Sequence, residues 1–166
     1  MVLAGETVLT GDLDPPGATR CRAYSSAGVT GAANDTLVLV PLGAESYDTA
    51  SMHSTDSNTS RITVPVDGCY HVIAQVGWAA NTTNRRVVSV RKNAAGSSGG
   101  GTQVMIASMS ASSSSGTQYQ ITDDLDLVAG DYLEIFALHN ITGGGTLNIV
   151  SGETNTFMVV RLVDPT

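Results

Sequence analysis

Three histidines are the side chains of this sequence best suited to bind a metal ion or transfer a proton. They are His53, His71 and His139, and none stands in the H-x-H or H-x-x-x-H spacing of a metal site. A metal-dependent enzyme therefore has no support in the sequence. We interpret His71, which lies in a stretch of alternating residues, as a hydrogen-bonded structural side chain.

The two cysteines, Cys21 and Cys69, could meet if the segments that carry them are neighbouring strands. Neither has the C-x-x-C or Cys/His context that catalysis or metal binding needs. In a reducing cytoplasm we expect buried thiols that act as small apolar side chains, and a disulfide is the alternative.

The densest group of carboxylates is Asp123, Asp124, Asp126 and Asp131, and its spacing does not match a D-x-D-x-D-G calcium loop. We interpret these residues as solvated turn carboxylates, with calcium binding as the alternative. The serines lack a G-x-S-x-G elbow, and the glycine runs lack the lysine of a phosphate-binding loop. The sequence predicts neither an enzyme nor a bound cofactor.

The stretch Arg61–Trp78 is expected to organise the fold, as two strands around a tight corner at Asp67-Gly68. Alternation in the second strand predicts one face buried in a core. That face holds Tyr70, Val72, Ala74, Val76 and Trp78. The opposite face is mixed and small, so it can lie against another sheet or against another copy of the chain. It holds His71, Ile73, Gln75, Gly77 and Ala79.

Further strands are expected at short intervals, with turns rich in Gly, Asn and Ser between them. They are Thr19–Ser25, Thr36–Pro41, an edge strand within Glu45–Ser57, Val87–Lys92, Gln103–Met109, Gln118–Ile121, Leu125–Val128, Tyr132–His139, Thr146–Val150 and Phe157–Val163. Gly28, Gly31 and Asn34 are expected to form a turn, and Ala129-Gly130-Asp131 a hairpin. With 166 residues and no helical periodicity, the chain is predicted to be one all-β sandwich or jelly roll.

Charge and hydropathy limit the partners. A formal charge of -7 argues against nucleic acid, whose phosphates attract clustered Lys and Arg. No stretch approaches the roughly 20 apolar residues of a membrane span. The opening residues lack the basic start and apolar run of a signal peptide, so we expect folding in a cytoplasm.

Residues 1–18 differ in kind from the domain expected at 19–166. Pro15-Pro16-Gly17 breaks regular structure after apolar residues scattered among small and acidic ones. These apolar residues are Leu3, Val8, Leu9 and Leu13. We interpret the segment as an arm, which is either a frayed terminus or a docking segment that orders when its leucines are buried against a partner.

Four motifs in order give the region from about Thr19 to Val163 a family resemblance. They are Gly68-Cys69-Tyr70, Lys92-Asn93-Ala94, Leu125–Leu133 with the pattern L-x-L-x-x-G-D-x-L, and Phe157–Leu162. The chain resembles the C1q/TNF-like jelly-roll superfamily, which implies a homotrimer. It departs from that pattern in its F-M-V-V-R-L ending and in having no collagen-like stalk, so assembly falls to the domain and the arm.

The motif residues have expected structural roles. Gly68 and Gly130 permit tight corners, Asp131 caps a turn through its side chain, and Tyr70 and Phe157 fill the interior.

The opening Ala4–Leu13 resembles the A-G-E-x-L-T-x-x-D-L start of structural proteins of tailed bacteriophages. Together the resemblances imply a trimeric capsid decoration protein on the outer surface of a phage head, assembled in the host cytoplasm. Its arm would bind the major capsid protein. One alternative is a tail-tip or head-fibre trimer that binds a host receptor or glycan through exposed aromatic residues. The candidates are Tyr24, Tyr47, Tyr119 and Trp78. A bacterial C1q-like adhesin or signalling ligand is a further alternative, which the missing export signal disfavours.

Overall fold

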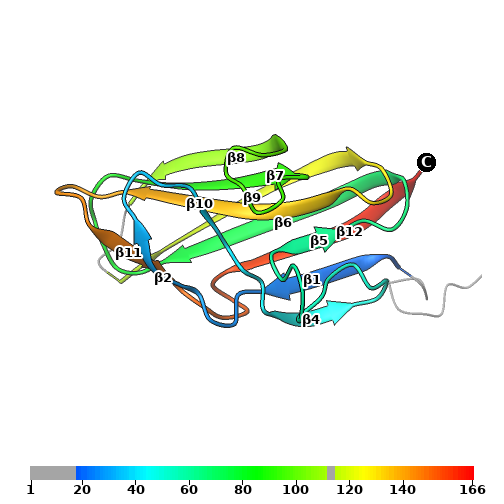
Figure 1. Ribbon diagram of the computed structural model, residues 1–166, viewed down its shortest axis with the longest axis horizontal. Coiled ribbons are helices and arrows are strands. Elements are labelled where there is room, and N and C mark those ends of the chain that lie inside the picture. Colours follow the sequence, from blue (N-terminus) through cyan, green and yellow to red (C-terminus); the bar gives the residue numbers. More distant parts are fainter. Residues whose placement is uncertain (1–17, 112–114) are drawn as a thin grey trace, which may run out of the picture.

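The computed structural model describes residues 18–111 and 115–166, and this part of the chain is built from strands, turns and loops without a helix (Figure 1). Accordingly, no helix that could cross a membrane is found there. The strands are β1 (Arg20–Tyr24), β2 (Val29–Ala33), β3 (Val38–Leu39), β4 (Ala44–Asp48), β5 (Arg61–Thr63), β6 (Gly68–Trp78), β7 (Arg85–Lys92), β8 (Thr102–Ser110), β9 (Thr117–Leu127), β10 (Tyr132–Asn140), β11 (Thr146–Ile149) and β12 (Phe157–Pro165).

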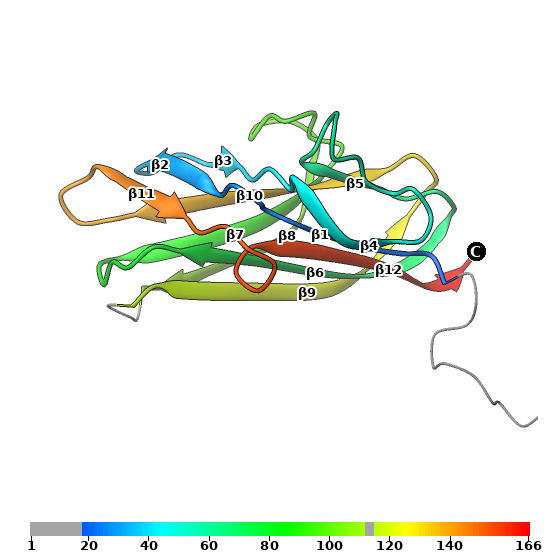
Figure 2. The same ribbon diagram turned by 90° about the horizontal axis from the view of Figure 1, so that it is seen from below.

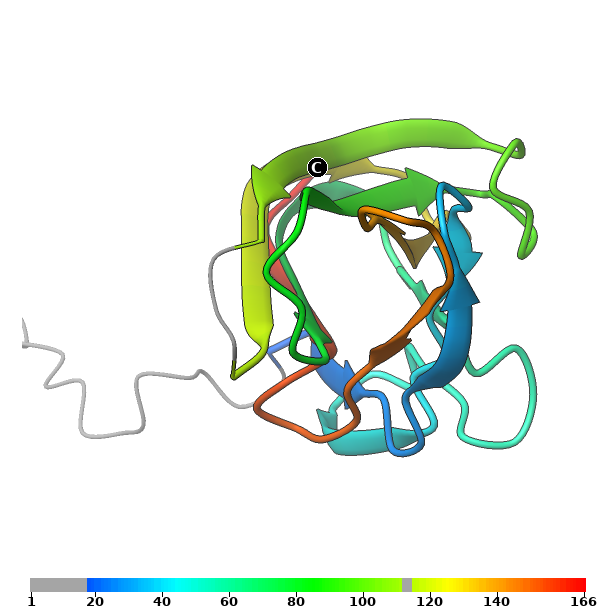
Figure 3. The same ribbon diagram turned by 90° about the vertical axis from the view of Figure 1, so that its left-hand side faces the viewer.

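The strands form two antiparallel sheets that pack face to face (Figures 2 and 3). The seven-stranded sheet has the order β2-β11-β6-β12-β1-β4, with β9 also paired to β6. In the five-stranded sheet the order is β3-β10-β7-β8, with β5 also paired to β10. One hydrophobic core lies between them and draws residues from both sheets. The prediction of an all-β sandwich is confirmed.

Strand β6 runs through the middle of the seven-stranded sheet and carries the alternation predicted for it. Tyr70, Val72, Ala74 and Val76 are each 0% exposed, and Trp78 is 1% exposed. Opposite them, the five-stranded sheet contributes Val88, Val90, Leu133, Ile135 and Ala137 to the same core. Period-2 alternation therefore identified the core face of this strand correctly.

The corner before β6 joins the two sheets, because β5 pairs with β10 whereas β6 pairs with β9 and β12. At Gly68 the backbones of β6 and β12 lie so close that a Cβ on this residue would be 2.6 Å from the carbonyl oxygen of Asp164. The Tyr70 hydroxyl donates to the Val66 carbonyl at 2.8 Å, and Asp67 Oδ1 accepts from the Ala129 N–H at 2.7 Å. Only glycine fits this close approach.

Two predictions near the start of the domain are wrong. The expected turn at Gly28, Gly31 and Asn34 is largely strand β2, which pairs with β11, and the Gly31 N–H donates to Asn148 Oδ1 at 2.8 Å. The expected strand Thr36–Pro41 shrinks to β3, Val38–Leu39. In both places pairing with residues distant in sequence decides the structure, and local turn propensity cannot report such pairing.

Strand β9 replaces two shorter strands predicted at Gln118–Ile121 and Leu125–Val128. It pairs with β6 without a break from Gly68↔Leu127 to Trp78↔Thr117. Ala129-Gly130-Asp131 is therefore not a hairpin within one sheet, because it carries the chain from β9 in one sheet to β10 in the other. Two strands were predicted instead of one because Asp123 and Asp124, which lie between them, are typical of a turn.

The connection between β7 and β8 covers part of the outer face of the five-stranded sheet, around Glu134 on β10. Here the Gly96 N–H donates to Glu134 Oε2 at 3.0 Å, and Arg91 Nε donates to the Gly100 carbonyl at 2.8 Å. Ser60 and Arg61 also donate to Glu134, at 2.9 and 3.2 Å, so this fully buried carboxylate is well partnered. The connection serves as a lid over this part of the face, whereas Ile106 on β8 is 55% exposed.

Candidate interaction surface

The outer face of the seven-stranded sheet carries two cross-strand rows of side chains, which we call the open face. Each row crosses β9, β6, β12 and β1 in register. The rows are Asp124, His71, Arg161 and Arg20, and next to it Thr122, Ile73, Val159 and Arg22. Unlike the outer face of the other sheet, the middle of this one has no lid of described residues above it.

His71 lies within the first row and is held from both sides of its ring. Its Nδ1 lies 2.6 Å from Asp124 Oδ1, and its Nε2 lies 3.2 Å from Thr122 Oγ1. The Asp124 side chain is 61% exposed, so the pair lies at the surface. The interpretation of His71 as a hydrogen-bonded structural residue is confirmed.

Ile73 and Val159 form the apolar middle of the open face. They are register partners on β6 and β12, and both are half-buried. Farther along β12, Val163 is 55% exposed. Half-exposed aliphatic side chains flanked by polar groups are typical of a surface on which another protein can pack.

Charge is unevenly distributed across the open face. In and beside the two rows, the β9 side carries exposed carboxylates at Asp124 and Asp126, whereas β12 and β1 carry Arg161, Arg20 and Arg22; beyond the rows, the end of β12 carries the exposed Asp164. Arg22 stacks on the Phe157 ring at 4.0 Å and lies 3.8 Å from Glu153. One side of the face is thus acidic and the other basic.

The acidic residues differ from their predicted setting. Asp123, Asp124 and Asp126 are exposed, as expected, but they lie on strand β9 instead of in a turn. In the described residues no group of three or more His, Cys, Asp or Glu side chains could hold a metal ion.

Asp131 lies in the turn before β10 and caps it as predicted, but it is only 7% exposed, so the expectation of a solvated carboxylate is corrected for this residue. Its carboxylate accepts from Asn93 Nδ2 at 2.7 Å, from Lys92 Nζ at 3.1 Å and from the Val128 N–H at 3.2 Å. Burial alone would raise the pKa of Asp131. The hydrogen bonds from Asn93 and Val128 and the charge of Lys92 outweigh burial, so the pKa lies below its usual value.

The other motif residues lie in different places: in the core, in a turn and on the outer face of the seven-stranded sheet. Tyr70 fills the core as predicted, and Gly130, with φ +90°, makes the turn that leads to Asp131. Phe157 is buried, but it pairs with Gln75 and Tyr24 on the outer face and lies under Arg22. The expectation that Phe157 fills the interior is therefore corrected: its ring is covered by a cation–π contact, which motif position does not reveal.

Cys21 and Cys69 cannot bond to each other because they point to opposite faces and β12 lies between their strands. Cys21 is a buried thiol, as expected, and burial raises its pKa. Cys69 is only half-buried, which corrects the expectation for that residue. Its pKa is raised by partial burial and then by Asp126, Asp124 and Asp164.

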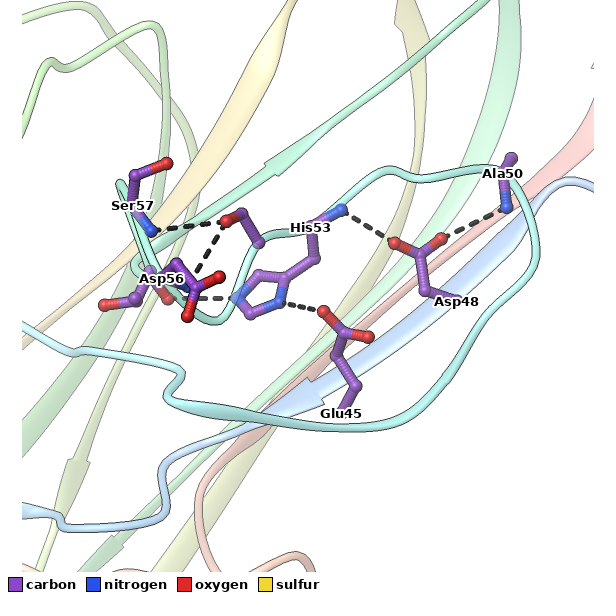
Figure 4. A network of polar contacts seen from close by, with 8 residues as sticks. Glu45, Asp48, Ala50, His53, Asp56 and Ser57 are labelled. Carbon is purple, nitrogen blue, oxygen red and sulfur yellow. Dashed lines mark hydrogen bonds and ion pairs between the residues drawn. The ribbon is translucent and has the colours of Figure 1, made fainter.

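His53 belongs to the polar loop that connects β4 to β5 (Figure 4). Its Nδ1 lies 2.7 Å from Glu45 Oε1 and its Nε2 lies 3.1 Å from the Thr59 carbonyl. Asp48 accepts from the N–H groups of His53 and Ala50 at 2.9 and 3.1 Å. These contacts fold the loop after β4, and sequence spacing gave no sign of them.

The aromatic residues considered for receptor binding do not form one exposed patch. Trp78 is in the core, and Tyr119 packs against the core from β9. Tyr47 lies under the Arg20 guanidinium, which is 4.9 Å from its ring centre. The arm residues Leu3, Val8, Leu9 and Leu13 lie outside the described residues.

No protein-family model matches the chain, and no curated protein sequence matches it. Solved structures do match. Eiger, a TNF protein of S. frugiperda, superposes with a TM-score of 0.67 at 16% identity, covering 91% of this chain and 96% of that chain. Murine APRIL at pH 5.0 gives 0.63 at 12% identity, covering 88% and 99%. The globular domain of a zebrafish complement 1qA protein gives 0.59 at 13% identity, covering 89% and 99%. Identities this low show the fold alone, and the fold is the expected C1q/TNF-like jelly roll.

Proposed function

We propose that this chain is a non-enzymatic structural protein of a bacteriophage virion, which acts as a trimer that decorates the outer surface of the capsid and stabilises the shell. The observation that carries the proposal is the open face, which is apolar in its middle and oppositely charged at its two sides. Such a surface favours packing against another copy of the chain over binding of a small substrate.

The charge distribution favours a cyclic assembly. When the basic β12 and β1 side of one copy meets the acidic β9 side of the next, every copy makes the same contact, and these contacts form a closed ring when the rotation between neighbours divides a full turn. The resemblance to the C1q/TNF-like superfamily implies that the ring has three members. A trimer also suits the local threefold positions of an icosahedral shell.

The location on a phage head rests on the sequence. The likeness of Ala4–Leu13 to the start of tailed-phage structural proteins supports it, and the arm offers Leu3, Val8, Leu9 and Leu13 for burial on the capsid lattice. Each buried apolar Å² contributes about 25 cal/mol. In a trimer, each of the three arms would make the same contact with the capsid lattice. Together these contacts would reinforce the junctions between capsomers.

Capsid binding tests the proposal. Purified protein is mixed with expanded capsids that lack it, and the bound amount is measured by sedimentation. We expect stoichiometric binding, and loss of binding when residues 1–18 are deleted. Val128→Ser, which removes an exposed apolar side chain elsewhere, is the matched control and should bind as the unmodified protein does. Failure of the intact trimer to bind any capsid would contradict the proposal.

A receptor-binding trimer of the tail tip or head fibre is the second candidate. It predicts saturable binding to host cells that survives deletion of the arm. The absence of one exposed aromatic patch among Tyr24, Tyr47, Tyr119 and Trp78 weighs against a glycan as its ligand.

A further inference from the structure

Figure 3 faces the end of the sandwich at which β6 ends and β7 begins. Four side chains with polar atoms form one layer at the β6 and β7 positions of this end. Trp78 and Thr117 are register partners in the seven-stranded sheet, and Arg86 and His139 are register partners in the five-stranded sheet. The two pairs meet across the interior. The Trp78 and His139 rings are 5.6 Å apart, edge to face, and the Arg86 guanidinium carbon lies 6.0 Å from the Trp78 ring centre.

Every member of this layer is buried and has a polar atom without a partner. Arg86 and His139 are 0% exposed, Trp78 is 1% exposed and Thr117 is 6% exposed. Within residues 18–111 and 115–166, Trp78 Nε1, Arg86 Nε, Thr117 Oγ1 and His139 Nδ1 have no hydrogen-bond partner. Buried polar atoms are rarely left unpaired, and four in one layer require an explanation.

Arg86 makes the layer cationic. Its Nη atoms donate to the backbone carbonyls of Thr83, Arg85 and Asn81 at 3.0 to 3.1 Å and to Asn81 Oδ1 at 3.3 Å. All four acceptors are neutral, and no carboxylate of the described residues pairs with this guanidinium. A buried charge without a counter-charge is costly, whereas Arg remains protonated under nearly all conditions.

The unpaired atoms include two fixed N–H donors, on Arg86 Nε and Trp78 Nε1, and the Thr117 hydroxyl can supply a third. His139 Nε2 lies 2.7 Å from the Ala32 carbonyl, so this nitrogen carries the ring proton in the neutral form. Water could pair with these groups but would leave the Arg86 charge uncompensated. An anion would accept from Arg86 Nε, Trp78 Nε1 and the Thr117 hydroxyl and would also compensate the charge, whereas the unprotonated Nδ1 of His139 would take no part in binding it.

We propose that Trp78, Arg86 and Thr117 of this layer bind a small monovalent anion such as chloride. A pocket of about 210 Å³ that opens to solvent borders the layer at Trp78 and Thr117, and Arg86 and His139 lie behind these two residues, outside its lining. The bound anion compensates Arg86 and ties the ends of both sheets together. This site is independent of the open face and of capsid binding.

Trp78 is the one tryptophan of the sequence, so its fluorescence reports on the site directly. Bromide is the probe, titrated into the full-length protein at constant ionic strength with fluoride as the balancing salt. We expect bromide to quench the fluorescence of Trp78 in a saturable way. Acrylamide, a neutral quencher tested separately, should give only weak and linear quenching of the buried indole. Bromide quenching that stays linear and no steeper than that of acrylamide would overturn the proposal and leave water as the occupant of the layer.

Arg86→Met removes the charge and the donors while keeping an apolar side chain of similar length. It should abolish saturable quenching, whereas Arg161→Met, on the open face, should leave it unchanged. If Arg86→Met does not fold, crystals of the unmodified protein soaked in bromide decide the question. An anomalous peak within hydrogen-bond distance of Arg86 Nε and Trp78 Nε1 supports the site, and a layer without a peak refutes it.

Discussion

The structural role of a single residue in this fold depends on its contacts with residues that are distant in sequence. Asp131 shows this, because its carboxylate joins the turn before β10 to Lys92 and Asn93 at the end of β7. Its capping role could be predicted from the pattern around Gly130-Asp131. Phe157 could not be placed in the same way, because the Arg22 side chain that covers it comes from β1, far away in the sequence.

Stability at acid pH tests Asp131. Its pKa is about 3.9 in an unfolded chain and lower in the folded one, so the carboxylate stabilises the fold above pH ~4. This contribution is lost as pH falls through the lower, folded-state pKa. Asp131→Asn should therefore be about 1.5–3 kcal/mol less stable at neutral pH in urea unfolding, with a difference from the unmodified protein that shrinks at acid pH.

Asp56→Asn serves as its control, because this exposed aspartate lies in the loop of His53 away from the turn. It should change stability by less than about 0.5 kcal/mol. A difference for Asp131→Asn that stays constant from neutral to acid pH would show that the carboxylate charge does not hold the turn.

Whole strands were predictable where alternation is strong and pairing continues the local pattern. β6 was predicted because its buried residues recur at every second position, and β7, β8, β10 and β12 lie close to their expected bounds because turn residues limit their apolar runs. β2 was missed because its glycines signal a turn, and its strand conformation depends on β11 more than a hundred residues later. The lid over the outer face of β10 was equally invisible, since loops carry no periodicity that reports what they cover.

The corner between β5 and β6 is the element whose failure should destroy the fold. In Gly68→Val the new Cβ would lie 2.6 Å from both the Asp164 carbonyl oxygen and Leu162 Cδ1, and the backbone atom cannot move aside cheaply. We expect no soluble, folded protein, as judged by circular dichroism and yield. Gly130→Ala is the matched change at the other inter-sheet turn. There a Cβ meets nothing within 4 Å, so only the positive φ is strained, at about 1–2 kcal/mol. A stable Gly68→Val variant would contradict the placement of this corner.

At the scale of the whole molecule, the two outer faces are not equivalent. The connection between β7 and β8 covers the five-stranded sheet around Glu134, whereas the middle of the seven-stranded sheet carries half-buried aliphatic side chains between oppositely charged ones. The sequence predicted that the outer face of β6 could meet another copy. It could not indicate the separation of charge, which arises only when β9, β12 and β1 are brought side by side by pairings distant in sequence.

Charge reversal across the open face tests the cyclic trimer. Asp124→Arg and Arg161→Asp, each alone, place like charges at every contact and should shift the protein from trimer to monomer in light scattering at micromolar concentration. The double reversal in one chain restores opposite charges at every contact, so it should recover the trimer. Ile73→Arg should prevent assembly by placing a charge in the apolar middle. Ile106→Arg, at an exposed position on the other sheet, should leave the trimer intact. An unmodified protein that scatters as a single 17.1 kDa chain under these conditions would exclude the assembly on which the decoration role depends.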